Sequence, residues 1–521
     1  MIAEKTAQDF LIKALTIPDM TGLPGDISLY ANVNAATFAP GKMYNNSEDD
    51  AGDVVLNTRQ RLEEAGWEFT KDVRWLLVLL SLYLILAGWM ALTNPLFEST
   101  DEIRHYRFIR ILITEKRLPV QGEEPLRAQS HHPPLYYVLS ALASAWVPSP
   151  HTGLFDQPLN PHWGYRNWEV GVDNKLQYRH AWSELLNLEN LAVYIPRLVN
   201  VYLGALTIAV TYGIGQLLWP ERRGTALAAA SLVAFNPQFI YLSGAINNDI
   251  LAALAGTVVL YLCLRSVQKG LDAKGAVGLG LAFSAAVLSK IHLAACAPVI
   301  FVTVGLAIRQ QLGKGQPNQW VVEWLRTMTI VIVITACGAG WWFLRNLHLY
   351  GDVTGMSRLN EMWGGRSLEN LWALQQGLPY LWSSLWGRFG YGQIPLPTTF
   401  YTVMAVVCGF GLLGMMSSKR SMPSGAQLAV VVLSIVIFSA VVSYYVLIQP
   451  AGAMGRFLFP VYPVFAVLVA GGWIGMLPRY HKAMAWGPSA GILCFALAAL
   501  LGYWYPAIRY PATPSGTGIA A

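Results

Sequence analysis

Charged residues are scarce in this sequence. Asp, Glu, Lys and Arg together make up 13% of its 521 residues, whereas hydrophobic residues make up 54%. A soluble domain normally carries about a quarter charged residues, so this chain has too few to cover its own surface. The scarcity argues against a soluble protein and predicts an integral membrane protein.

Cysteine is also rare, and it is never clustered. The five cysteines stand singly inside apolar runs, at Cys263, Cys296, Cys337, Cys408 and Cys494. This pattern argues against a disulfide framework and against a CxxC metal site; it is typical of small packing residues. The chain also lacks a GxGxxG loop between a strand and a helix, so no nucleotide-binding loop is expected.

The excess of positive charge is small. The formal net charge is +6, and the cytoplasmic loops of membrane proteins collect Lys and Arg without any nucleic-acid partner. We therefore expect membrane lipids around the protein and no nucleic acid bound to it.

No cleavable signal segment opens the chain. Residues 1–72 are mixed polar and include an acidic stretch at 45–53. We expect this segment to be a weakly structured cytoplasmic extension, partly helical near its end. A transmembrane domain over residues 73–505 and an external tail over residues 506–521 follow it.

Apolar runs of about 20 residues, the length that crosses a bilayer, recur along the chain. Eleven lie near residues 73–93, 195–218, 226–246, 250–266, 275–290, 292–309, 326–344, 396–416, 426–448, 457–477 and 484–505. Lys and Arg gather in the loops 220–224, 265–275, 309–315, 417–421 and 478–482. All five loops fall on the cytoplasmic side if the N-terminus is cytoplasmic. The sequence thus predicts an all-α, multi-pass protein of the plasma (inner) membrane with about eleven transmembrane helices.

One further apolar stretch, residues 131–148, does not fit this topology. Counting it as a span would place the basic loop 220–224 outside and invert every later loop. We therefore predict a shallow or re-entrant helix that starts after two prolines. Residues 94–194 then form one large external loop with juxtamembrane helices, and residues 345–395 form a second external segment.

Ionisable residues follow the first apolar run directly. Asp101 and Glu102 are adjacent, so their side chains diverge by about 100° on a helix. His105 lies four residues after Asp101 and three after Glu102, where it can share a helical face with either one. A carboxylate near a His at the membrane exit suits a general base or a metal ligand. The alternative is an amphipathic helix that floats at the lipid headgroups.

The stretch HHPPLYY at residues 131–137, combined with this Asp-Glu pair, resembles the GT-C superfamily of membrane glycosyltransferases. The likeness is greatest to the protein O-mannosyltransferase and aminoarabinose-transferase branch, in its bacterial, polyprenyl-phosphate-sugar-dependent form. Similar motifs occur at residues 195–249, 288–298, 340–352 and 455–464. Thr100 departs from the pattern, because a proline is common at that position.

The resemblance implies transfer of a sugar from a polyprenyl-phosphate carrier to a glycan, lipid or protein acceptor on the external face. A lipid phosphate at the interface needs cations at the ends of spans. Four lie at predicted external ends and are the candidate phosphate ligands: Arg197, Lys290, Arg345 and Arg456. Snorkelling to the headgroups is the alternative for each of them.

The resemblance also singles out polar and aromatic residues of the external loops. His132 matches the family's HPP or KPP motif, and is a candidate donor to the phosphate, with His131 beside it at the substrate. Asn247, Asn248 and Asp249 match its external turn, although a helix cap explains them equally well. The aromatic residues that could stack on a sugar are Tyr136, Tyr137 and Trp163, although aromatic residues are also common at membrane interfaces.

No cofactor is certain from the sequence. Asp101, Glu102 and His132 could hold a divalent metal ion, but no HExxH or other full ligand set is present. The mechanism that we expect is a single displacement with inversion, in which Asp101 takes the acceptor proton and Arg456 stabilises the leaving phosphate. Glu102 and His105 would position the acceptor or Asp101.

Two other functions fit a membrane protein of this kind. A transporter or flippase of lipid-linked saccharides would carry ionisable residues in mid-membrane and an inverted repeat. Here the charges gather at loop edges, and no repeat is evident. A catalytically inactive scaffold of the same fold is the third candidate, and the intact Asp-Glu and HPP motifs argue against it.

Overall fold

The computed structural model describes residues 73–122, 128–147, 188–313, 317–364, 372–417, 423–449, 454–476 and 481–509. All of them belong to the second of two compact units, Phe69–Ala521. The predictions for residues 1–72, for Trp163 and for most of the C-terminal tail lie outside these residues.

The described chain is almost entirely helical, as predicted. A helix at Val73–Thr93 opens it. The next helices are α3 (Glu102–Thr114), α4 (Leu135–Ser144), α5 (Leu188–Leu218), α6 (Arg223–Ala234), α7 (Pro237–Ser243), α8 (Asp249–Lys269), α9 (Ala273–Ser289) and α10 (Cys296–Leu312). The remaining helices are α11 (Pro317–Tyr350), α12 (Met356–Trp363), α13 (Trp372–Trp386), α14 (Thr398–Ser417), α15 (Gly425–Ile448), α16 (Tyr462–Met476), α17 (His481–Ala499) and α18 (Tyr505–Arg509). Two short strands, β1 (Arg388–Phe389) and β2 (Ile394–Pro395), pair antiparallel as a hairpin.

Every predicted span coincides with an apolar helix of the described chain. Eight of these helices are long and apolar enough to cross a membrane, and a ninth results if α6 and α7 count as one span bent by 61°. The bend lies where Pro237 removes a backbone donor and Asn236 caps the new helix by accepting a hydrogen bond from the Phe239 N–H. Two of the predicted spans correspond to helices shorter than 18 residues: α9 has 17 residues and α16 has 15.

Within the described residues, the apolar stretch that begins at residue 131 forms only a short helix. Its helix α4 has ten residues and is therefore about 15 Å long, roughly half the thickness of the hydrocarbon core. It packs against α3 and α5. The length of α4 agrees with the predicted short helix, and its place at the outer face of the membrane stays a prediction.

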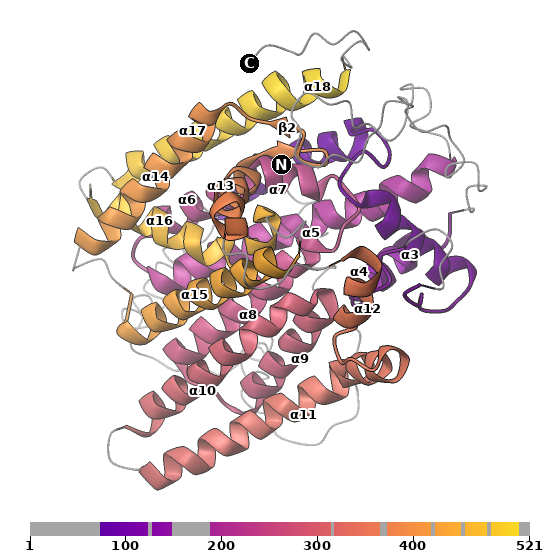
Figure 1. The fold of residues 1–521 in the computed structure, drawn as a ribbon. Helices are drawn as coiled ribbons and strands as arrows, with labels where there is room; N and C mark the ends of the chain where they lie inside the picture. The colour runs from indigo at the N-terminus through magenta and orange to yellow at the C-terminus, as the bar shows by residue number, and fades with distance from the viewer. Residues whose placement is uncertain are drawn as a thin grey trace, which may run out of the picture. The chain divides into compact units, whose positions relative to one another are not determined.

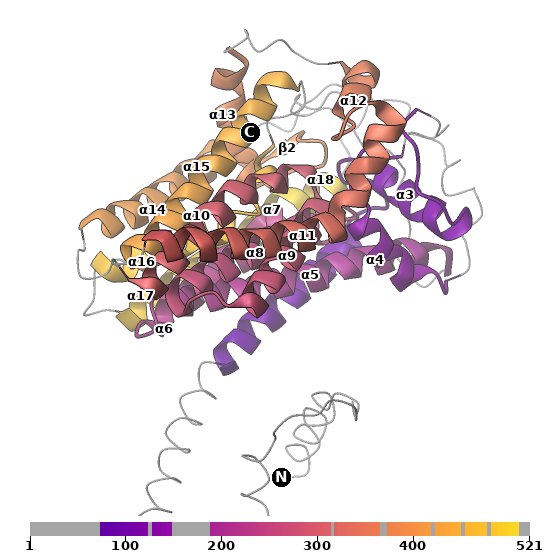
Figure 2. The same cartoon turned by 90° about the horizontal axis from the view of Figure 1, so that it is seen from below.

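Helix α8 lies at the centre of the bundle, where it packs against α5, α9 and α10. Small residues allow other helices to approach closely: a Cβ at Gly472 in α16 would lie 1.7 Å from the carbonyl oxygen of Gly411 in α14. Helices α3, α4 and α12 gather at one end of this bundle in both views (Figure 1 and Figure 2). The candidate site lies at that end.

Candidate active site

Asp101 stands at the N-terminus of α3 in a strained conformation. Its backbone is left-handed, with φ 61° and ψ 5°, a region that a non-glycine residue adopts at a cost of about 1–3 kcal/mol. Such strain persists only where the neighbouring chain is held firmly. The residue after Asp101 provides one such anchor.

Glu102 is buried and forms a two-fold ion pair with Arg197 of α5. Arg197 Nε donates to Glu102 Oε1 at 2.7 Å, and Arg197 Nη2 donates to Oε2 at 2.8 Å. The Ile246 N–H also donates to Glu102, at 2.9 Å. Both side chains of the pair are completely buried, so the pair links α3 to α5 inside the protein.

Arg197 has no donor left for a phosphate. Its other N–H groups donate to the carbonyl oxygens of Ala91, Asn94 and Pro95, at 2.7 to 3.0 Å. With the two bonds to Glu102, these account for all five N–H groups of an arginine. The predicted phosphate-binding role of Arg197 is therefore corrected to a structural one, and the same pair removes Glu102 from the reacting groups.

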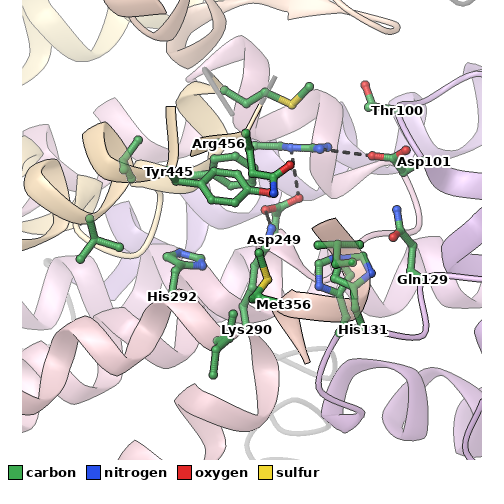
Figure 3. A pocket seen from close by; sticks show the side chains of 18 of the residues that line it. Thr100, Asp101, Gln129, His131, Asp249, Lys290, His292, Met356, Tyr445 and Arg456 are labelled. Carbon is green, nitrogen blue, oxygen red and sulfur yellow. Dashed lines mark hydrogen bonds and ion pairs between the residues drawn. The ribbon is translucent and has the colours of Figure 1, made fainter. Parts of the chain in front are cut away.

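Asp101 faces a network of buried charges drawn from three other parts of the chain (Figure 3). Arg456 Nη2 lies 3.4 Å from Asp101 Oδ2, and Arg456 Nε lies 3.6 Å from Asp249 Oδ2. Asp249 is also paired with Lys290 Nζ. The network thus joins two carboxylates and two cations that are far apart in the sequence.

These charges form one wall of a cavity of about 390 Å³. Asp249 begins α8, Lys290 follows the end of α9, and Arg456 precedes α16. The end of α15 also lines the cavity, with the apolar side chains of Val441, Val442 and Ile448. Met356 and Leu359 of α12 also line the cavity.

Four histidines border the same cavity, and three of them come from α3 and the segment before α4: His105, His131 and His132. His105 Nδ1 lies 2.8 Å from the Tyr137 hydroxyl group, and the His105 and His132 rings are parallel with centroids 5.6 Å apart. Burial lowers the pKa of His105 to about 3 and that of His131 to about 4, and it also lowers the pKa of His132. All three imidazoles are therefore neutral near pH 7, and the predicted donor role of His132 is that of an uncharged ring.

The other predicted residues lie outside this cavity lining. Arg345 Nη2 donates to the Pro119 carbonyl oxygen at 2.8 Å, and its guanidinium group covers the Trp342 ring. Tyr136 donates to the Pro196 carbonyl oxygen, and Tyr137 packs flat against Phe108. Neither tyrosine is available to stack on a sugar in this arrangement, because both are fully buried.

The three residues of the predicted external turn, 247–249, have different roles: two stabilise helix ends, and one lines the cavity. Asn247 Oδ1 accepts hydrogen bonds from the Asp249 and Ile250 N–H groups, as a helix cap does. Asn248 Nδ2 donates to the Ser289 carbonyl oxygen, which fixes the end of α9. Only Asp249 reaches the cavity.

Sequence reasoning missed several residues of the cavity lining: Arg104, Gln129, His292 and Tyr445. Arg104 could have been found, because it lies one helical turn after Asp101; its Nη1 lies 3.5 Å from Asp101 Oδ1. Gln129 and His292 lie two residues from the predicted residues His131 and Lys290, whereas Tyr445 is brought to the cavity by the fold alone.

The predicted metal site has no full ligand set among the residues that the structure describes. No three His, Cys, Asp or Glu side chains there are arranged to hold a metal ion. Of the predicted ligands, Glu102 has both carboxylate oxygens bound to Arg197.

One protein-family model matches part of the chain. Residues 174–350 match the model of the PMT family, described as dolichyl-phosphate-mannose-protein mannosyltransferase. This match confirms the resemblance that the sequence motifs predicted. No curated protein matches the chain.

Solved membrane glycosyltransferase structures show a distant likeness. ArnT from Cupriavidus metallidurans bound to undecaprenyl phosphate has a TM-score of 0.49 and 13% identity, over 84% of this chain and 66% of that one. The oligosaccharyltransferase AglB from Archaeoglobus fulgidus, in complex with an inhibitory peptide and a dolichol-phosphate, has a TM-score of 0.41 and 16% identity, over 84% of this chain and 55% of that one. This chain thus spans less than two thirds of the length of either protein.

Proposed function

We propose that this protein is a membrane glycosyltransferase that moves a sugar from a polyprenyl-phosphate carrier to an acceptor hydroxyl group. The observation that carries the proposal is the cavity, whose lining combines a strained aspartate and two buried cations with apolar side chains of α15. A lipid phosphate has the matching parts, namely an anionic head and a hydrocarbon chain. The match to the PMT family supports the same reaction class.

Asp101 is the better base of the two carboxylates in the network. Asp249 is 2% exposed and is bound by both Lys290 and Arg456. Asp101 has only the long contacts to Arg456 and Arg104 within the described ion pairs, at 3.4 and 3.5 Å, beyond the usual range of a strong hydrogen bond. Its oxygens can therefore accept a bond from an incoming hydroxyl group.

The reaction is a single displacement. The acceptor oxygen gives its proton to the Asp101 carboxylate and forms a bond to the anomeric carbon of the sugar. The bond between that carbon and the phosphate oxygen breaks, and its electron pair stays on the phosphate. Arg456 and Lys290 stabilise the growing negative charge of the leaving lipid phosphate, and the configuration at the anomeric carbon is inverted.

The site faces the external side in this proposal. Helix α8 runs from Asp249 at the cavity to Lys269 over 21 residues, or about 31 Å. The basic loop after Lys269 therefore lies at the opposite end of the bundle from the cavity. Because cytoplasmic loops collect Lys and Arg, the cavity is external and the N-terminus cytoplasmic.

The test is an assay with purified protein in nanodiscs. We expect a radiolabelled polyprenyl-phosphate sugar to be transferred to an acceptor or, without one, to be slowly hydrolysed. Each of these reactions should be lost in Asp101→Asn. Movement of the labelled lipid across sealed vesicles without transfer would contradict the proposal in favour of a flippase, and absence of all three activities with a panel of sugars would favour a scaffold.

A further inference from the structure

The β1–β2 hairpin contacts the chain directly before Asp101. Thr100 Oγ1 donates to the carbonyl oxygen of Gly390, at the turn of the hairpin, with a distance of 2.5 Å. Gly390 has a φ of 63°, so this turn position favours glycine. The two residues are 290 positions apart in the sequence.

Tyr241 of α7 strengthens the same junction. Its hydroxyl oxygen accepts hydrogen bonds from the Gly390 N–H and from Ser99 Oγ, each at 3.1 Å. Gln238, also in α7, accepts a hydrogen bond from the Arg388 N–H at 2.8 Å. The hairpin is thus fixed to a buried helix, and residues 99 and 100 are fixed to the hairpin and to that helix.

The strain at Asp101 explains why this junction matters. A left-handed residue other than glycine persists where the surrounding structure holds it in place. Glu102 holds the following side through Arg197, and Thr100 holds the preceding side through Gly390. Asp101, which faces Arg456, thus stands between two residues that are each bound to a distant part of the chain.

We propose that Thr100 and the β1–β2 hairpin position Asp101 for proton abstraction. The inference rests on the proposed function, since it gives the hairpin a role through Asp101. Thr100 does not react; its hydroxyl group determines where the carboxylate stands. Donor binding depends on Arg456 and Lys290 and does not require this bond.

Thr100→Val tests the proposal, because valine keeps the shape of threonine and removes the hydroxyl group. We expect single-turnover transfer at saturating donor to slow by about 10- to 100-fold, the usual effect of a small misplacement of a reacting group. The dissociation constant for polyprenyl phosphate should stay unchanged. Thr100→Ser should restore most of the rate, because it restores the donor.

Thr335→Val is the matched control. Thr335 Oγ1 also donates to backbone carbonyl oxygens, those of Val331 and Gly280, but in α11 and far from the cavity lining. The Thr335→Val protein should lose some thermal stability in detergent and keep the wild-type transfer rate. If Thr100→Val does not fold, Tyr241→Phe replaces it, because this variant removes the shared acceptor of Gly390 and Ser99.

Two results would overturn the inference: a wild-type rate in both Thr100→Val and Tyr241→Phe, or a Thr100→Ser enzyme as slow as Thr100→Val. Either result, with Asp101→Asn inactive, removes the hairpin from the mechanism and leaves the proposed function intact. A wild-type chain without any transferase activity would instead remove the proposed function itself.

Discussion

Asp101 and Asp249 are both aspartates beside Arg456, yet their surroundings differ. Asp249 is almost fully buried and paired with Lys290, whereas Asp101 is 16% exposed at its side chain and open to the cavity. A buried, paired carboxylate fixes the cations, and an open one can take a proton. We therefore expect Asp249 to position the cations and Asp101 to accept the proton.

Asp101→Asn should abolish most of the turnover. The amide keeps the shape of the side chain but cannot accept the proton, so the rate should fall by about 10²–10⁴. Binding of polyprenyl phosphate should change little. The measurement is single-turnover transfer, with Glu115→Gln, an exposed carboxylate just after the same helix, as the control. A wild-type rate in Asp101→Asn would refute the mechanism.

Arg456→Ala should weaken donor binding. Loss of a desolvated, charge-assisted partner costs on the order of 2–5 kcal/mol. Arg456→Lys should recover only part of the affinity, because a point charge replaces a planar fork. Titration with polyprenyl phosphate measures both values. Arg326→Ala serves as the control, since Arg326 is 67% exposed in a surface pair; equal affinity in Arg456→Ala and Arg326→Ala would exclude Arg456 from the phosphate site.

At the scale of elements, α3 is held to α5 by the buried pair of Glu102 and Arg197 rather than by apolar contacts alone. Breaking a buried ion pair leaves one charge without its partner and costs about 3–5 kcal/mol. We expect Glu102→Gln to lower the melting temperature in detergent clearly. The exposed pair of Arg358 and Glu361 is the comparison, because a surface pair contributes about 0–1 kcal/mol. A Glu102→Gln protein as stable as Glu361→Gln would contradict the structural role.

The packing of α3 against α4 should also make the protein sensitive to acid. Burial lowers the pKa of His105 to about 3, below the value of about 6.5 in an unfolded chain. Between these values the unfolded state binds more protons than the folded state, so stability falls as the pH is lowered from 6.5 towards 4.

Thermal melts between pH 7 and pH 4 measure this effect. His105→Gln should reduce the slope of melting temperature against pH, because glutamine does not titrate. His348→Gln, on an exposed stretch of α11, should keep the wild-type slope. Parallel slopes for wild type and His105→Gln would show that His105 is not the group responsible.

For the whole molecule, the position of the cavity relative to the basic loops predicts the orientation in the membrane. Single cysteines at Lys116 and Glu221, both exposed, should react with an impermeant maleimide from opposite sides in a background without the five native cysteines. Lys116 follows α3 near the cavity, and Glu221 lies in the basic loop between α5 and α6. Labelling of both from the same side would invert the topology after residue 148.

The sequence by itself determined the membrane class, the positions of the apolar helices and the end of the bundle where the ionisable residues gather. These features depend on local composition: a run of about 20 apolar residues must cross the bilayer, and a charge beside it must stay near the interface. Asp101, Lys290 and Arg456 were predicted as site residues from the sequence, and the stretch at residues 131–148 was predicted not to be a span.

Only the tertiary structure decided which charges meet. Arg197 and Arg456 look alike in the sequence, since each begins a predicted span. In the fold, Arg197 pairs with Glu102, 95 residues away, and Arg456 reaches Asp101, 355 residues away. The rotation of a helix about its own axis decides whether such a side chain enters a cavity or a packed interface. That rotation depends on how the neighbouring helices pack. The Thr100–Gly390 bond arises in the same way, from two loops that only the folded bundle brings together.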